Sequence, residues 1–547
     1  MLPPNFPPKS PLRPAVPVGQ MPPMGQRLPV GQMSATGQVP PARPTYPTGQ
    51  MSSSGQMPSS SQMPPINVPS QQSSPNQTTS PPVQKAEVQQ SVLRFLPFVL
   101  GGLLVLVLVF FIFRSLFGSK GTSSPSTGVA TGNSATSKST GSITNNTGTS
   151  KSTSSITLTY WGLWEPTAIL QEVLTDFESS HPGVKVNYQM QSYQDYRDRL
   201  QNAIAQNRGP DVFRFNAAWT PMLQNELSPM PDTVYNAAEF SSTFYPAAAQ
   251  MLTMNSKIDG VPLMYEGLAL LYNDDALRAA DAQPPKTWHD LKDLATKLTI
   301  RSGDKIQRAG MAIGNATNVD NFSDILALLI FQNGGDPSNP TSQNVSDALT
   351  FYTNFMKTDK VWDDSLPNST MAFARENVAM IMVPSWRIHD IKALNPNLKF
   401  TVIPVPQLTS TKVTFANFWA EGVSSQSNYK TESWQLLKYM SSADVLRKLY
   451  SSASKNRAFG ELYPRVDMAG ELASDPYANA YLSDAPYAKG WYMSSATHDN
   501  GLNDEIIKYY QDAVTAMLGN TDAPTALGTV AQGVSQILRQ YGLASGQ

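Results

Sequence analysis

The 547-residue sequence contains no cysteine. Disulfide bonds, thiolate metal sites and cysteine nucleophiles are therefore excluded. A chain without cysteine is compatible with either face of a membrane, so its location must be inferred from other features.

Histidine is scarce, and the short motifs of common enzymes are absent. The sequence has four histidines, at His181, His289, His389 and His498. None of their spacings is typical of a metal pair. Neither a Gly-x-Ser-x-Gly motif nor a Gly-x4-Gly-Lys phosphate loop occurs. Tyr509-Tyr510 could suggest a ferric-ion site, but the pair falls inside a helical pattern, which favours packing. We expect no metal, no cofactor and no enzyme activity, although a glycosidase-like pair of carboxylates remains open.

Charge is unevenly distributed. Residues 1–94 carry six Lys and Arg against one acid, Glu87, and residues 114–155 carry four basic residues and no acid. Subtracting these from totals of 40 basic and 41 acidic residues leaves 30 and 40 in residues 156–547, a net charge of −10. Such an acidic segment argues against nucleic acid as its partner.

Residues 95–113, FLPFVLGGLLVLVLVFFIF, form a nineteen-residue stretch without any charge. As a helix it would be roughly 28 Å long, about the thickness of a bilayer's hydrocarbon core. A buried core helix would normally carry a polar face, and a signal peptide would begin near residue 1. We therefore predict a single membrane-spanning anchor.

Low-complexity segments flank this stretch. Residues 1–94 hold 21 of the 44 prolines and repeat GQM at irregular spacing. This composition predicts a disordered tail, with docking of a proline-reading partner as the alternative. Residues 114–155 are mostly Ser, Thr, Gly and Asn, which predicts a flexible linker.

From residue 156 onward, strand and helix patterns alternate. Apolar residues recur with the spacing of a strand, or form a short apolar run, in residues 156–160, 184–188 and 211–213. Between them, residues 169–177 and 193–206 have apolar residues at helical spacing. This βαβαβ order predicts a parallel sheet with helices on its faces. Residues 261–273 are an apolar run interrupted by Glu266 and Gly267, and the last third reads as mostly helical. Because residues 156–547 are more than a single hydrophobic core usually contains, we expect two lobes.

Several stretches of this part resemble a known family when they are taken together and in order. They are TLTYWGLWEP, FESSHPGVKV, RGPDVFRFN, KIDGVPLMYEGLALLYNDDAL, PPKTWHDLKDLATKLT, FARENVAMIMVPSW, NFWAEGVSS and TESWQLLKYMSS. The chain from 156 to 547 thereby resembles the extracellular solute-binding proteins of ABC importers, in particular the sugar-binding group. It lacks the lipobox cysteine of many members, and the predicted span would take the place of the lipid.

The resemblance implies an α/β, two-lobed periplasmic-binding-protein-like (type II) fold with hinge strands and a helix-rich C-terminal part. It places the ligand in the cleft between the lobes, and the partners it implies are a mono- or oligosaccharide and ABC permease subunits. We expect the chain to cross between lobes near residues 265–271 and 404–418. Basic residues are balanced at both ends of the span. The implied function, rather than charge, therefore places the domain outside and the tail in the cytoplasm.

A carbohydrate site needs carboxylates and amides in the plane of the sugar ring, and aromatic faces to stack on it. In α/β sheets such residues lie on loops that follow strands. The candidates chosen on this basis are Trp161, Trp164, Glu165, Asn216, Trp219, Tyr265, Glu266, Trp386, Arg387, Trp419, Glu421, Trp491 and Tyr492.

Packing is the alternative for several of these side chains. Trp161 and Trp164 could each lie under the sheet instead of in the cleft. Other residues fit structural roles better, because Trp288, Trp362 and Trp434 lie where core positions are expected. Asp211 fits a strand-end cap, and Arg457 fits a solvated position.

Three functions follow from these features. The first is a membrane-anchored substrate-binding protein that delivers a carbohydrate to an ABC permease. The second is a ligand sensor or surface adhesin without transport, and the third is a cell-surface glycoside-active enzyme. The sequence favours the first.

Overall fold

The computed structural model describes residues 155–543 with the exception of Ala496. These residues belong to one compact unit, Ser142–Gln547. The predicted tail 1–94, the predicted span 95–113 and nearly all of the predicted linker 114–155 lie outside the described residues. Within the described part, no helix combines the length and the hydrophobicity needed to cross a membrane.

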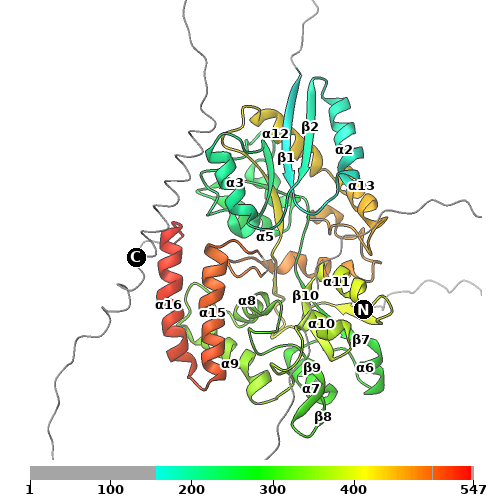
Figure 1. Ribbon diagram of the computed structural model, residues 1–547, viewed down its shortest axis with the longest axis vertical. Helices are drawn as coiled ribbons and strands as arrows, with labels where there is room; N and C mark the ends of the chain where they lie inside the picture. The colour runs from blue at the N-terminus through cyan, green and yellow to red at the C-terminus, as the bar shows by residue number, and fades with distance from the viewer. Residues whose placement is uncertain (1–154, 496, 544–547) are drawn as a thin grey trace, which may run out of the picture. The chain divides into compact units, whose positions relative to one another are not determined.

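Two five-stranded sheets organise the unit, and each forms the centre of one lobe (Figure 1). The first-lobe sheet has the order β2 (Val184–Met190), β1 (Ile156–Gly162), β3 (Val212–Asn216), β13 (Trp419–Val423) and β6 (Val261–Pro262). The second-lobe sheet has the order β11 (Phe400–Ile403), β7 (Leu268–Asn273), β10 (Val378–Pro384), β9 (Lys305–Met311) and β8 (Ile300–Ser302). Two short pairs complete the strands, β12 (Thr414–Phe415) with β14 (Ala488–Lys489) and β4 (Thr253–Met254) with β5 (Lys257–Ile258).

The predicted βαβαβ unit is confirmed in the first lobe, where β1 pairs in parallel with both β2 and β3. The first-lobe helices are α2 (Thr167–Ser180), α3 (Tyr196–Ala205), α4 (Ala237–Thr243), α5 (Pro246–Leu252), α12 (Lys430–Met440) and α13 (Ala443–Ser454). Helix α2 buries Leu170, Val173, Leu174 and Phe177, the stripe expected from helical spacing. Helices α12 and α13 pack against α2.

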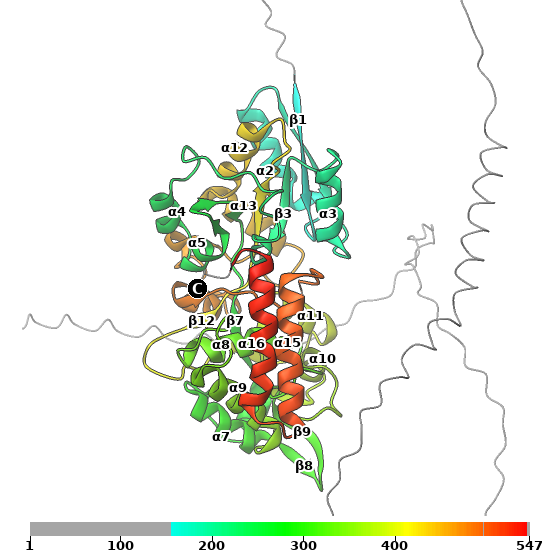
Figure 2. The same cartoon turned by 90° about the vertical axis from the view of Figure 1, so that its left-hand side faces the viewer.

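The second lobe contains most of the later helices. They are α6 (Asp274–Ala279), α7 (Trp288–Leu298), α8 (Phe322–Gln332), α9 (Gln343–Lys357), α10 (Ser369–Ala374), α11 (Arg387–Leu394), α14 (Ala478–Asp484), α15 (Leu502–Leu518) and α16 (Ala523–Gln540). Thr287 and Asp290 form a capping box at the start of α7. Helices α15 and α16 lie side by side and pack against α9 (Figure 2).

The chain passes between the lobes at the two places expected from the sequence. Residues 263–267 connect β6 of the first sheet to β7 of the second, and residues 404–418 connect β11 to β13. A third crossing, residues 455–477, connects α13 to α14 and was not predicted. Helix α14 packs against β7 and β11, so the chain has reached the second lobe there.

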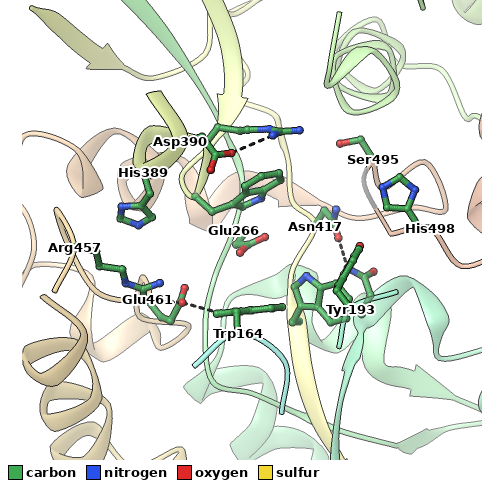
Figure 3. Close-up of a pocket in the computed structure, with 14 residues that line it drawn as sticks. Trp164, Tyr193, Glu266, His389, Asp390, Asn417, Arg457, Glu461, Ser495 and His498 are labelled. Carbon is green, nitrogen blue, oxygen red and sulfur yellow. Dashed lines mark hydrogen bonds and ion pairs between the residues drawn. The ribbon is translucent and has the colours of Figure 1, made fainter. Parts of the chain in front are cut away.

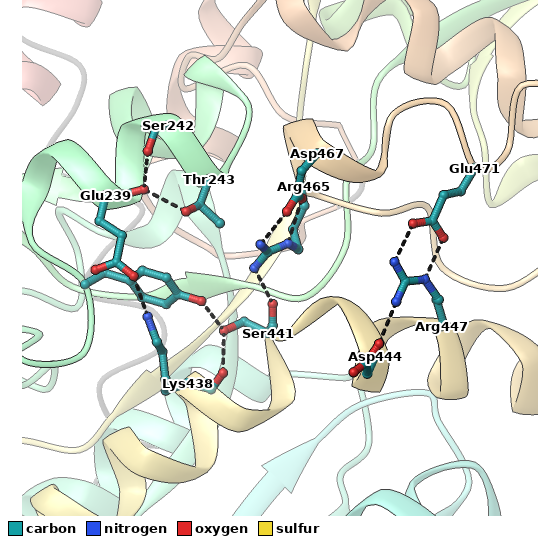
Figure 4. A network of polar contacts seen from close by, with 11 residues as sticks. Glu239, Ser242, Thr243, Lys438, Ser441, Asp444, Arg447, Arg465, Asp467 and Glu471 are labelled. Atoms are coloured by element: carbon teal, nitrogen blue, oxygen red, sulfur yellow. Dashed lines mark hydrogen bonds and ion pairs between the residues drawn. The ribbon is translucent and has the colours of Figure 1, made fainter.

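Polar contacts hold much of the third crossing against the first lobe (Figure 4). Arg465 Nη1 donates to the Ser441 carbonyl oxygen at 3.1 Å, and Arg465 also pairs with Asp467 at 2.7 Å. Arg447 of α13 pairs with Glu471 at 2.7 Å. Ion pairs with at least one partly exposed member contribute little free energy individually, and the contacts of Arg465 with Ser441 and of Glu471 with Arg447 fix the path of this segment along the first lobe.

The tryptophans expected in the core are buried there. Trp288, Trp362 and Trp434 each have an exposed fraction of 1%. Trp288 Nε1 donates to Gln332 Oε1 at 2.6 Å and Trp362 Nε1 donates to Asn318 Oδ1 at 2.7 Å, which satisfies these polar groups inside the core. Asp211 is a strand-end cap as predicted, because its carboxylate accepts from Thr159 N and Ser427 Oγ.

Candidate functional site

A cavity of about 480 Å³ lies where the lobes meet. Its volume is in the range of small-molecule sites in proteins. It is lined by Trp164, Tyr193, Asn216, Glu266, Trp386, Arg387, His389, Asp390, Asn417, Trp419, Arg457, Glu461, Ser495 and His498. Both lobes contribute, and so do all three crossings, through Glu266, Asn417 and the pair Arg457 and Glu461.

Strand ends bring the first-lobe residues to the cavity. Trp164 follows β1, and Asn216 is the last residue of β3. Trp419 begins β13, and the antiparallel register pairs it directly with Asn216. Because β13 runs opposite to β3, its beginning lies at the same sheet edge as the carboxyl ends of β1 and β3. In the second lobe, Trp386 follows β10 in the same way.

Aromatic rings form one wall. The rings of Trp164 and Trp419 meet edge to face, with centroids 5.3 Å apart and planes at 81°. Tyr193 packs on Trp419 at 5.9 Å, and Trp219 supports Trp419 from the core at 5.1 Å. On the second-lobe side, the Arg387 guanidinium lies over the Trp386 ring at 4.2 Å. Such rings offer the flat apolar faces on which the C–H faces of a sugar can stack.

Glu266 lies near the middle of the lining residues (Figure 3). Only 5% of its surface is exposed, and no hydrogen bond or ion pair joins its carboxylate to the described part of the chain. Burial, reinforced by the nearby Glu461 carboxylate, raises the pKa of Glu266 well above its usual range. A buried carboxylate without a protein partner is costly, so this group is available to accept hydrogen bonds from a ligand.

The other charges around the cavity are paired locally. Arg387 pairs with Asp390 at 3.1 Å, and Arg457 pairs with Glu461 at 2.7 Å. Trp164 Nε1 donates to Glu461 Oε1 at 3.2 Å. Among residues 155–543 without Ala496, the Nε atoms of both arginines are buried without an acceptor.

His389 adds a further polar atom. Burial, together with the positive charge of Arg457, lowers the pKa of His389 below its usual value of 6.5. Its ring packs on Phe459 with centroids 4.4 Å apart. Nδ1 of His389 is buried and has no partner in the described residues. A neutral imidazole in this position can donate or accept one hydrogen bond.

The residues between β14 and α15 connect the lobes at the cavity. Ser495 N donates to Asp324 Oδ1 of the second lobe at 3.0 Å. On the first-lobe side, Arg197 Nε donates to the Asp499 carbonyl oxygen at 2.6 Å. His498 packs edge to face on Tyr193 at 6.0 Å. Burial raises the pKa of Asp324 to about 6, although hydrogen bonds from Ser495 oppose the shift.

The structure brings six of the thirteen predicted site residues to the cavity wall. They are Trp164, Asn216, Glu266, Trp386, Arg387 and Trp419. Their contact with a ligand stays a prediction. The other seven lie elsewhere, namely Trp161, Glu165, Trp219, Tyr265, Glu421, Trp491 and Tyr492.

The positions of three of these seven follow from the local structure. Trp161 still belongs to β1, and its Nε1 donates to Gln189 Oε1 of β2 at 3.0 Å. Tyr265 packs on Tyr245 in the core, whereas the next residue, Glu266, lines the cavity. Glu421 shares a sheet face with Trp419 but lies two residues further from the edge.

The remaining four have packing or pairing roles. Glu165 and Glu421 both pair with Arg214 in the first lobe. Trp219 is buried behind Trp419. Trp491 and Tyr492 pack on each other and on the core, with ring centroids 5.7 Å apart.

Eight lining residues were not among the predicted set. They are Tyr193, His389, Asp390, Asn417, Arg457, Glu461, Ser495 and His498. The expectation that Arg457 is solvated is wrong, because its side chain is only 24% exposed and pairs with Glu461. The i,i+4 spacing of Arg457 and Glu461 was a usable signal. Tyr193 follows β2 and obeys the strand-end rule.

No group of three or more His, Asp or Glu side chains in the described residues could hold a metal ion. The aromatic rings and locally paired charges of the cavity are a composition that suits an uncharged or weakly charged polar molecule. The cavity offers aromatic faces and one free carboxylate.

The sequence of this chain is similar to known binding proteins. Residues 172–459, a little over half of the chain, match the family described as bacterial extracellular solute-binding protein. A relative from Streptococcus mutans, named multiple sugar-binding protein, is 22% identical over 303 residues, which are 52% of this chain and 71% of the relative.

Solved structures share the two-lobed fold. An ABC transporter solute-binding protein from Thermotoga lettingae, bound with alpha-D-tagatose, is 24% identical with a TM-score of 0.55, and the match covers 70% of this chain and all of that one. A cyclo/maltodextrin-binding protein complexed with maltotetraose is 16% identical with a TM-score of 0.58, over 70% and 97% of the two chains. At these identities the likeness establishes the fold. The family match, which covers more than half of the sequence, shows that this chain belongs to the bacterial extracellular solute-binding protein family.

Proposed function

We propose that this chain is a membrane-anchored substrate-binding protein that captures a carbohydrate in the interlobe cavity and delivers it to an ABC permease. The family supports capture of a solute outside the cell. The sugar-binding name of the Streptococcus mutans relative and the sugars bound by the two similar structures support a carbohydrate as the solute.

The observation that carries the proposal is the Glu266 carboxylate. It is buried, faces the cavity and has no partner in the described part of the chain. A carboxylate accepts hydrogen bonds through two oxygens, and adjacent sugar hydroxyls can supply both. Binding would thereby give this carboxylate the hydrogen-bond partners that the described part of the chain does not supply.

The tryptophans complete the complementarity. Trp164 and Trp419 lie on the first-lobe side and Trp386 lies on the second-lobe side. A sugar between them would stack its apolar faces on indole rings while its hydroxyls reach Glu266. We propose the fourteen lining residues as the ligand contacts, with the buried predicted residues Trp219, Tyr265 and Glu421 in supporting positions.

Contacts from both lobes favour a closed state. A ligand that touches Trp419 on one lobe and Trp386 on the other gains both contacts only when the lobes approach each other. The three crossings are the segments around which this movement would occur, and each of them also lines the cavity. Binding and closure would therefore be coupled at the same residues.

The parts outside the described residues complete the proposal. We assign 1–94 to a cytoplasmic disordered tail, 95–113 to a single transmembrane helix, 114–155 to a flexible linker and 156–547 to an external solute-binding domain. The uncharged stretch FLPFVLGGLLVLVLVFFIF supports the anchor. Deletion of residues 95–113 should release the protein from the membrane fraction, and equal fractionation of both forms would contradict the anchor.

A thermal-shift screen of the full-length chain tests carbohydrate capture. The panel contains D-tagatose, D-glucose, maltose and maltotetraose. A sugar present at 100 times its Kd should stabilise the protein by about 2.7 kcal/mol, and its epimers at the same concentration should not. If no sugar in the panel or among further mono- and oligosaccharides shifts the melting temperature, carbohydrate is not the ligand.

A further inference from the structure

Behind the aromatic wall of the cavity lies a cluster of buried charges, Arg214 with Glu165 and Glu421. Arg214 of β3 and Glu421 of β13 are direct cross-strand partners. Arg214 Nε donates to Glu421 Oε1 at 2.7 Å, and Arg214 Nη1 donates to Glu165 Oε2. The exposed fractions of the three residues are 3%, 0% and 5% in the order Arg214, Glu421 and Glu165.

This ion cluster is poorly suited to stabilise the fold. It places two carboxylates against one guanidinium, and burial raises the pKa of Glu421. Oε2 of Glu421 has no partner among the residues that the structure describes. Buried ion groups can often be replaced by uncharged residues without loss of stability, because the desolvation penalty offsets their attraction. A contribution to stability therefore does not by itself explain the cluster.

The cluster contacts one cavity residue directly. The Arg214 guanidinium carbon lies 4.7 Å from the centre of the Trp164 ring, a cation–π arrangement. Glu165 follows Trp164 in the chain, so its bond to Arg214 also holds the loop after β1. Tyr188 Oη fixes the same loop by donating to the Glu165 carbonyl oxygen at 2.8 Å.

The ring of Trp164 is thus held from several directions. Arg214 lies over the ring, Trp419 meets it edge to face at 5.3 Å, and its Nε1 donates to Glu461 at 3.2 Å. Trp419 belongs to β13 of the same sheet and Glu461 belongs to the third crossing, but both line the cavity, where an entering ligand can disturb them. Arg214, on β3, is the one of these three contacts that does not line the cavity.

We propose that Arg214, held by Glu165 and Glu421, is a positioning residue that fixes the Trp164 ring in the orientation that a ligand stacks on. Arg214 does not line the cavity itself. The effect on ligand affinity rests on the carbohydrate-binding function proposed above. The effect on the Trp164 ring does not depend on any ligand and can be tested separately.

The test uses the full-length chain labelled with 5-fluorotryptophan and observed by ¹⁹F NMR. The W164F and W161F variants assign the two lines. In the variant E165Q/R214M/E421Q, which removes the whole ion cluster, the Trp164 line should shift or split while the Trp161 line stays in place. Trp161 is a suitable control because it lies three residues away but bonds to β2 instead.

Two results would overturn the positioning role. One is an unchanged Trp164 line in the triple variant. The other is movement of both lines together with a large fall in melting temperature, since this reports a general loss of structure. If the triple variant does not fold, R214K gives the same test, because lysine keeps the charge but lacks the fork that holds two carboxylates.

Affinity provides the second measurement. For the panel sugar that gives the largest thermal shift, the Kd of the triple variant should rise at least tenfold at a melting temperature comparable to that of the wild type. An unchanged Kd would contradict the proposed effect on binding. If the wild type binds no sugar, the proposed function fails, and the Trp164 line still decides whether Arg214 positions the ring.

Discussion

Replacement of Glu266 by glutamine tests the centre of the proposed site. The substitution keeps the shape of the side chain and replaces its ionisable carboxyl group by a neutral amide, which has one acceptor oxygen fewer. The Glu266 carboxylate has no hydrogen bond or ion pair within the described part of the chain, so the substitution removes no polar contact of the side chain. Any effect on binding therefore reports the ligand.

The expected loss of affinity follows from the strength of hydrogen bonds to charged groups. Such bonds contribute about 1.5–3 kcal/mol when a buried carboxylate is the acceptor. With about 1.4 kcal/mol for each factor of ten, the Kd of E266Q should rise by roughly 10- to 150-fold. Isothermal titration with the panel sugar that gives the largest thermal shift measures this directly.

The same variant should change the stability of the unliganded protein in a pH-dependent way. Burial raises the pKa of Glu266 well above its ordinary value of 4.5, so between these two values the folded state binds more protons than the unfolded state. The free energy of unfolding therefore falls as pH rises above about 4.5, by up to about 1.4 kcal/mol per pH unit for this group. E266Q lacks this contribution, so its stability advantage over the wild type should grow with pH.

Denaturant titrations of both proteins from pH 4.5 to 8 check the sign. Glu226→Gln is the matched control, since Glu226 is partly buried in the first lobe with one unpartnered oxygen and does not line the cavity. E226Q should leave the Kd unchanged. If E266Q binds sugar as tightly as the wild type, Glu266 is not a ligand contact, and if its relative stability falls as pH rises, burial does not raise the pKa of Glu266.

Further substitutions test the wall of the cavity and the packing of the fold. W164A should weaken sugar binding at least tenfold, whereas W161A, outside the cavity, should bind as the wild type does in the same titration. In β9, G310A should lower the melting temperature strongly, because a Cβ there would lie 1.8 Å from the Ala295 carbonyl oxygen. By contrast, G528A in α16 meets open space and should stabilise the protein by about 0.5–1 kcal/mol in a denaturant titration; a loss of stability there would contradict the packing described.

Periodicity was sufficient to predict most elements of the fold. The alternation of apolar residues in β1 and the helical stripe of α2 reflect burial of one face, which depends on nearby sequence alone. The capping box at Thr287 was readable for the same reason. The third crossing could not be predicted in this way, because the apolar residues of 455–477 have no regular spacing. This segment is held by side-chain contacts of Arg465 and Arg447 with partners distant in the chain.

The site was partly predictable because sheets bring strand ends together. The rule found Trp164, Asn216 and Trp386, each at or just after the end of a strand. The rule could not tell which of Trp161 and Trp164 lines the cavity, since this depends on β1 ending at Gly162, between the two tryptophans. A shift of one residue in that boundary would change which indole reaches the cavity.

Other lining residues depend on tertiary contacts that leave no local pattern. Ser495 and His498 lie in irregular backbone that is anchored through Asp324 on one lobe and Arg197 on the other. Glu421 was predicted to lie in the cleft because it is near the start of a strand. In the structure it instead faces Arg214, two residues further from the sheet edge than Trp419. Depth along a strand is set by register, which one sequence does not reveal.

Hydrogen exchange with and without the best panel sugar most directly tests whether the ligand binds between the lobes. Bound sugar should slow amide exchange in residues 263–267, 384–390 and 415–419, which belong to both lobes and two crossings. Residues 300–311, in β8 and β9, should exchange at the same rate in both samples because none of them lines the cavity. Protection confined to one lobe, or absent from all three segments, would contradict capture in the interlobe cavity.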